Sequence, residues 1–181
     1  MVKDDFIGLV FENKLGQRYI VEEFISSDSK NRFYEVEFLN TGYRKITTKS
    51  AIKKGAIKDQ YEPSVAGIGY KGDCTIPVKS KEYSVWHNMI NRCYNCNSTE
   101  YCRYGEKGVT VDPNWYNFAK FCEDLPFIEG WDEELFREGQ LYLDKDRKSD
   151  PDNKIYSLET CIFLSATENN PANNYNIYNH K

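Results

Sequence analysis

The sequence has no long hydrophobic run, no secretory leader and no excess of positive charge. Its longest apolar stretch, Phe6 to Phe11, is interrupted by a glycine and falls far short of the ~20 residues that span a bilayer. The opening Met-Val-Lys-Asp-Asp lacks the apolar segment of a secretory signal. We therefore expect no membrane span and a cytoplasmic location.

The charge is slightly negative and unevenly distributed. The 24 basic and 28 acidic side chains give a net charge of −4. This charge argues against non-specific nucleic-acid binding by the protein surface as a whole. Residues 1–80 carry a net charge of +2 and residues 81–181 a net charge of −6, so any DNA contact must be local. A basic turn with Lys49, Lys53 and Lys54 is one candidate for a phosphate contact, and a solvated turn is the alternative.

Histidine is scarce, and the six cysteines include a single C-x-x-C pair. Without a leader, reduced thiols are expected rather than disulfides. Zinc is one hypothesis, because His87, Cys93, Cys96 and Cys102 have the thiolate and imidazole groups that suit tetrahedral zinc. The other is that these cysteines are small buried hydrophobic side chains, since a second C-x-x-C is absent.

The composition is that of a folded chain, with 40% hydrophobic and 15% aromatic residues. Short β-branched and aromatic segments at 6–11, 19–25, 33–39 and 43–48 are separated by turn residues. They predict a small β-barrel of the Src-homology type over residues 1–62. Glycine and proline then crowd together, which predicts a linker over 63–82.

Residues 83–181 predict a second domain that mixes helices and strands, so the fold class is α+β. Apolar residues at helical spacing predict a helix over 83–94, and its opposite face offers Asn88 and Arg92 either to DNA or simply to solvent. A second helix is expected from Asp112 onward. Two strands, 141–146 and 161–164, precede a helix start at Ser165, where the S-x-x-E sequence is typical of a capping box.

The second half also contains an ordered series of short motifs. They are Trp86-x-x-Met89-x-x-Arg92-Cys93-Tyr94, Gly108-Val-Thr-Val111, Trp115-x-x-Phe118-x-x-Phe121, Leu143-Asp-Lys-Asp146, Asn153, Tyr156-Ser157, Thr160-Cys-x-Phe163 and Asn169. In their order and spacing they resemble a family of phage and mobile-element HNH, or His-Me finger, endonucleases.

This resemblance implies a ββα-metal unit at about 141–174 and double-stranded DNA as the substrate. It places Asp144 and Asn169 as ligands of Mg²⁺ or a similar divalent ion. Asp146 is a further candidate ligand beside Asp144, and the alternative is that both are ordinary acids at a solvated strand end. The resemblance also places Lys145 at the position of the catalytic base and Thr160 at that of the asparagine that orients the base.

The chain departs from the family at the base, because no histidine stands there and lysine is protonated near neutral pH. The motif is therefore degenerate. We expect the protein to act by binding, either to DNA or to a host defence nuclease such as a CRISPR effector, as an anti-CRISPR inhibitor in a bacterial host would. This last expectation rests on analogy. The alternative is an active metal-dependent HNH endonuclease that nicks or cuts DNA.

Overall fold

The computed structural model describes residues 4–145 and 154–169. The chain divides into two units, Met1–Glu62 and Pro63–Lys181, and each has a hydrophobic core of its own. The protein is mixed α+β, as the sequence predicts at this level.

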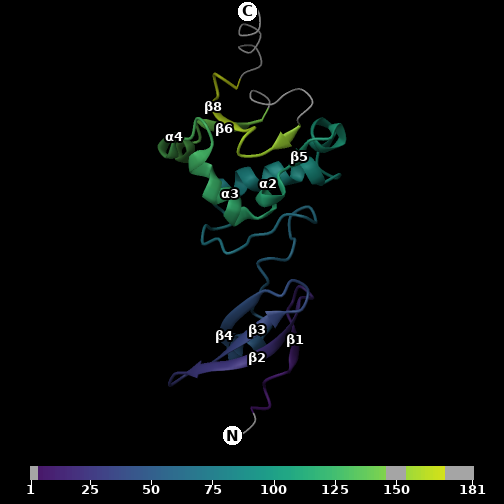
Figure 1. Ribbon diagram of the computed structural model, residues 1–181, viewed down its shortest axis with the longest axis vertical. Coiled ribbons are helices and arrows are strands. Elements are labelled where there is room, and N and C mark those ends of the chain that lie inside the picture. The colour runs from purple at the N-terminus through teal and green to yellow at the C-terminus, as the bar shows by residue number, and fades with distance from the viewer. Residues whose placement is uncertain (1–3, 146–153, 170–181) are drawn as a thin grey trace, which may run out of the picture. The chain divides into compact units, whose positions relative to one another are not determined.

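The N-terminal unit is built on an antiparallel sheet of four strands in the order β1-β2-β3-β4 (Figure 1). Strand β3 alternates as its sequence predicts, with Tyr34, Val36 and Phe38 buried and the residues between them half-buried. Val21 of β2 lies opposite Val36 and is also buried, so one face of the sheet is apolar. The strands are β1 (Val10–Glu12), β2 (Arg18–Ser27), β3 (Arg32–Phe38) and β4 (Arg44–Thr48).

The sheet does not close into the barrel that the sequence predicts. Closure requires the first and last strands to pair, whereas β1 and β4 are the two edges of this sheet among the described strands. Strand β1 has only three residues, and directly after β4 the chain enters helix α1 (Lys49–Lys53), which Thr48 caps. This helix buries Ile52 in the core of the unit, so a helical turn takes the place of a closing strand.

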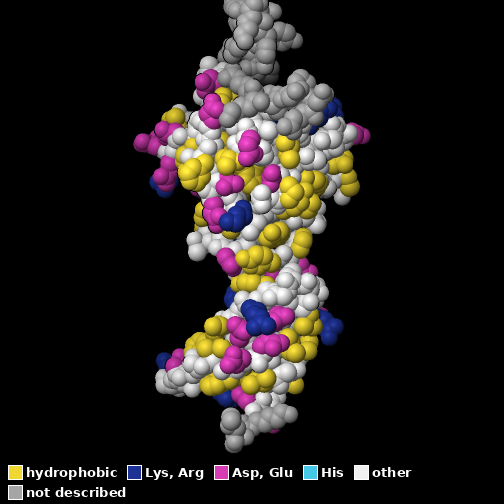
Figure 2. Space-filling model, in the orientation of Figure 1, with side chains coloured by type: hydrophobic (Ala, Val, Ile, Leu, Met, Phe, Trp, Pro, Cys, Tyr) yellow, Lys and Arg dark blue, Asp and Glu magenta, His cyan; other side chains and the backbone are white. Residues whose placement is uncertain are grey.

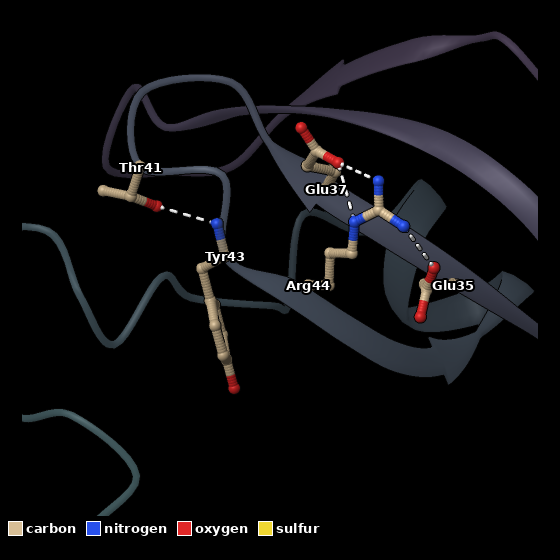
Figure 3. A network of polar contacts seen from close by, with 5 residues as sticks. All are labelled: Glu35, Glu37, Thr41, Tyr43 and Arg44. Carbon is tan, nitrogen blue, oxygen red and sulfur yellow. Dashed lines mark hydrogen bonds and ion pairs between the residues drawn. The ribbon is translucent and has the colours of Figure 1, made fainter.

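An exposed ion-pair network joins β3 and β4 (Figure 3). Arg44 Nε donates to Glu37 Oε2 at 2.8 Å, and Arg44 Nη1 lies 3.3 Å from Glu35 Oε2. Figure 2 shows acidic side chains grouped around basic ones on the visible face of this unit. Because exposed ion pairs are screened by water, we expect them to contribute little to stability.

In its described residues, the second unit combines three α-helices with two small sheets (Figure 1). The helices are α2 (Lys81–Tyr94), α3 (Phe118–Asp124) and α4 (Glu133–Glu138). The sheets are a parallel pair, β5 (Thr110–Val111) with β7 (Ile155–Tyr156), and an antiparallel pair, β6 (Leu141–Asp144) with β8 (Ile162–Ser165). Short 3₁₀ helices connect these elements at Tyr101–Arg103 (η1), Gly105–Lys107 (η2), Pro113–Tyr116 (η3) and Leu125–Phe127 (η4).

Helix α2 is the central element of this unit. As its spacing predicts, one face is buried and consists of Trp86, Met89, Ile90 and Cys93. The helix expected from Asp112 is instead two elements, η3 and α3. The break occurs because the Asn117 side chain accepts a hydrogen bond from the backbone N–H of Ala119 at 2.9 Å and so caps a new helix.

Residues 63–82, expected to be a linker, fall within the second unit. Val65 and Cys74 are buried in its core, and the backbone N–H of Tyr70 donates to Tyr116 O at 2.9 Å. Gly69 lies close against α2, since a Cβ at this position would lie 3.0 Å from Trp86 Cζ2, which is tighter than most Cβ contacts. The glycines that suggest a linker thus allow the chain to pack closely against α2.

The end of β8 carries the capping box that the sequence predicts. Ser165 N donates to Glu168 Oε2 at 2.9 Å, and Glu168 N lies 3.3 Å from Ser165 Oγ. Residues 166–169, where this helix is expected to begin, form turns, and the rest of the segment expected to run to about 174 lies outside the described residues. No described helix is long and apolar enough to cross a membrane.

The buried side chain of Asn13 gives a test of the N-terminal unit. Asn13 Nδ2 donates to Gln17 Oε1 at 2.7 Å and to Ile57 O at 2.8 Å, so Asn13→Ala leaves buried polar groups without partners. We expect this variant to lower the free energy of unfolding by about 1–3 kcal/mol, measured by urea unfolding of the full chain. The control is Asn40→Ala, since the exposed Asn40 amide makes one bond of 3.3 Å. Equal losses in both variants would contradict the interpretation.

Candidate functional site

A hollow of about 340 Å³ lies between helix α2 and strand β6, and we call it the α2–β6 hollow. Its lining combines cationic, amide and aromatic side chains with a single carboxylate. The described lining residues are Lys81, Val85, Asn88, Arg92, Tyr104, Gly139, Leu141, Tyr142, Leu143, Asp144, Lys145, Tyr156 and Asn169. Concave sites with a few converging polar groups are the usual form of ligand sites.

Three of the four positions that the resemblance marks as catalytic line this hollow. Asp144 ends strand β6, Lys145 follows it, and Asn169 lies in the turn after β8. Strand β6 pairs with β8 in antiparallel register, with Asp144 opposite Ile162 and Leu141 opposite Ser165, and the turn after Ser165 places Asn169 at the hollow. The structure therefore brings together residues that are 24 positions apart in the sequence.

The fourth position, Thr160, does not line the hollow. Its buried hydroxyl donates to Ile155 O at 2.6 Å and accepts from Ser157 N at 3.0 Å. Thr160 thus holds the turn between β7 and β8, which is a structural task.

Both candidate DNA contacts on α2 line the hollow. Asn88 is exposed, whereas Arg92 is half-buried with its guanidinium carbon 4.9 Å from the ring centroids of both Tyr104 and Tyr156. Such cation–π contacts hold the guanidinium in a defined position.

The basic turn of the first unit is helix α1, and it lies beside a different hollow, of about 700 Å³. Lys49 and Lys53 line that hollow together with Arg32, and Lys49 Nζ lies 4.3 Å from the ring centroid of Phe6. Lys54 caps the C-terminal end of α1 and is exposed, but it is not part of the lining.

The four residues of the zinc hypothesis are not brought together. Cys93 is buried in the core, Cys96 and Cys102 are exposed, and the carbonyl of His87 accepts a bond from Asn91 Nδ2 at 2.9 Å. In the parts of the chain that the structure describes, no three His, Cys, Asp or Glu side chains form a group suited to a metal. Burial raises the pKa of the Cys93 thiol to about 11.

The ligand set for a divalent ion fits only in part. Asp144 and Asn169 both line the α2–β6 hollow and offer the oxygen atoms that Mg²⁺ prefers, while Asp146 lies outside the described residues. Arg92 and Lys145 line the same hollow, and their positive charges oppose the binding of a cation. The donor types fit a metal, but the surrounding charge does not.

Tyr104 is one of the lining residues that sequence reasoning missed, as are Lys81 and Tyr142. It lies next to Gly105, where a Cβ would approach Cys93 O to 2.2 Å, so only glycine lets η2 pack this closely on α2. The only hint of Tyr104 in the sequence is the glycine that follows it, and this glycine does not show which helix the tyrosine contacts.

No protein-family model, no curated protein and no solved structure matches the chain. The function must therefore be argued from the residues of the α2–β6 hollow.

Thiol reactivity tests how the cysteines are placed. Burial raises the pKa of Cys161 to about 12 and that of Cys93 to about 11, whereas Cys96 and Cys102 are exposed. With iodoacetamide at about pH 8, we expect Cys96 and Cys102 to be alkylated at least about a hundredfold faster than Cys93 and Cys161, because only thiolates react. Mass spectrometry of the digested protein gives the rates, and urea should abolish the difference. Rapid labelling of Cys93 in the folded protein would contradict this assignment.

Proposed function

We propose that the second unit is an HNH-like module that binds double-stranded DNA and acts by binding. The observation that carries the proposal is that Asp144, Lys145 and Asn169, placed by the motif resemblance, line one hollow with Asn88 and Arg92 of α2.

The lining suits a nucleic-acid backbone. Lysine and arginine bind phosphate oxygens, and asparagine amides add hydrogen bonds to phosphate, sugar or base edges. Three cationic side chains, Lys81, Arg92 and Lys145, line the hollow against one described carboxylate, Asp144. The hollow is thus locally basic within a unit that is acidic as a whole, which agrees with the local DNA contact expected from the charge distribution.

Binding is favoured over cleavage because the hollow has no suitable base among its described residues. Lys145 occupies the position that the family gives to histidine, and His87 is not part of the lining. An active endonuclease is the second candidate, favoured by the presence of Asp144 and Asn169 at the same hollow. A host defence nuclease as the partner stays a prediction from the sequence.

Charge changes in the hollow test DNA binding. We expect Asn88→Asp and Lys145→Gln each to weaken binding of a short DNA duplex by about ten- to a hundredfold, because each weakens a charge-assisted contact. Fluorescence anisotropy at about 50 mM salt gives the affinities. The matched control for Lys145→Gln is Lys120→Gln, since Lys120 is an exposed residue of α3 paired with Glu123. Equal binding by all four proteins would refute the proposed site, and no binding by any would refute the function.

Plasmid cleavage separates the two candidates. With supercoiled DNA and Mg²⁺ or Mn²⁺ at low salt, we expect the natural protein to give no more nicking than Asp144→Ala, because the hollow offers no competent general base. Gel electrophoresis of the plasmid measures the result. Metal-dependent nicking that disappears in Asp144→Ala would establish the endonuclease in place of the binding protein.

A further inference from the structure

Two positively charged side chains approach one aromatic ring in the α2–β6 hollow. Arg92 Cζ lies 4.9 Å and Lys145 Nζ 5.8 Å from the ring centroid of Tyr156. They come from different elements, Arg92 from α2 and Lys145 from the residue after β6. Both charges act to lower the pKa of the Cys93 thiol, against the larger effect of its burial, which agrees with their convergence on one place.

Arg92 has no anionic partner among the residues that the structure describes. No described carboxylate forms an ion pair with it, and its buried Nε has no hydrogen-bond acceptor within reach. Its guanidinium instead rests against the faces of Tyr104 and Tyr156. Aromatic faces compensate only partly for the loss of water around a cation. An anion bound beside the Arg92 guanidinium would relieve this cost.

We infer that Arg92 and Lys145 form a cradle for one phosphate group of a nucleic-acid backbone, and that this cradle works without a metal ion. The planar fork of arginine matches phosphate oxygens, and lysine adds a point charge. Tyr104 and Tyr156 are positioning residues that hold the guanidinium. The inference rests on the proposed function for the source of the phosphate, which is DNA.

This assignment differs from what the HNH resemblance implies. The resemblance implies that a divalent ion neutralises the phosphate. In the inferred cradle, Arg92 and Lys145, which line the hollow with Asp144 and Asn169, neutralise the phosphate instead. The consequence is that phosphate binding should be the same in EDTA and in Mg²⁺.

Inorganic phosphate tests the cradle directly. In ¹⁵N-labelled full-length protein with EDTA, we expect the Nε–Hε resonance of Arg92, identified by its absence in Arg92→Lys, to shift saturably with phosphate. Chloride at matched ionic strength should leave it in place. A resonance that does not respond to phosphate, or responds only after Mg²⁺ is added, would overturn the inference.

The salt dependence of DNA affinity tests whether Arg92 contacts the phosphate backbone of DNA. Arg92→Gln should weaken duplex binding about ten- to a hundredfold and reduce the slope of log K against log salt by about 0.9, the value of one phosphate contact. Arg103→Gln is the matched control, because Arg103 is exposed and pairs with Glu100. An unchanged slope in Arg92→Gln would overturn the inference.

The response of the Arg92 resonance to phosphate also tests whether Tyr104 positions the guanidinium. Tyr104→Leu should weaken the response of the Arg92 resonance to phosphate, and Tyr104→Phe should restore it, because the ring and not the hydroxyl holds the guanidinium. If Tyr104→Leu and Tyr104→Phe respond alike, Tyr104 does not position Arg92.

The two proposals fail in different ways. A phosphate response of Arg92 without any binding of duplex DNA would refute the proposed function and support the anion cradle. DNA binding that is unchanged in Arg92→Gln, with no phosphate response, would refute the cradle and support the function.

Discussion

The indole N–H of Trp86 donates a buried hydrogen bond to the carbonyl oxygen of Trp115 at 2.7 Å, and the arrangement of the second unit depends on it. The bond holds α2 against the turn that leads into α3, while the Trp86 ring packs on Phe118 with 5.3 Å between ring centroids. Because one face of α2 is fixed in this way, its other side carries Asn88 and Arg92 to strand β6. The hollow is thus a consequence of how the core is packed.

The parts of the fold that follow from local pattern could be predicted from the sequence. The alternation of β3, the buried face of α2 and the capping box at Ser165 each depend on residues close together in the chain. Barrel closure and the linker depend on long-range packing instead. Nothing in the local pattern shows that β1 has three residues or that Gly69 lies against Trp86.

The candidate site shows the same division. Motif order was enough to select Asp144, Lys145 and Asn169, which line one hollow in the structure. The four residues of the zinc hypothesis do not form a cluster in the described part of the chain, since the helical period turns Cys93 into the core and Cys96 lies beyond the end of α2. The contact of Arg92 with Tyr104 and Tyr156 joins three separate segments, and no spacing rule predicts it.

All three tryptophans of the chain, Trp86, Trp115 and Trp131, belong to the second unit. The core of the N-terminal unit contains tyrosine and phenylalanine in their place. Light that excites tryptophan selectively therefore reports on one unit alone, and two of its three reporters, Trp86 and Trp115, are almost completely shielded from water. The molecule carries an intrinsic optical probe of the very unit that holds the α2–β6 hollow.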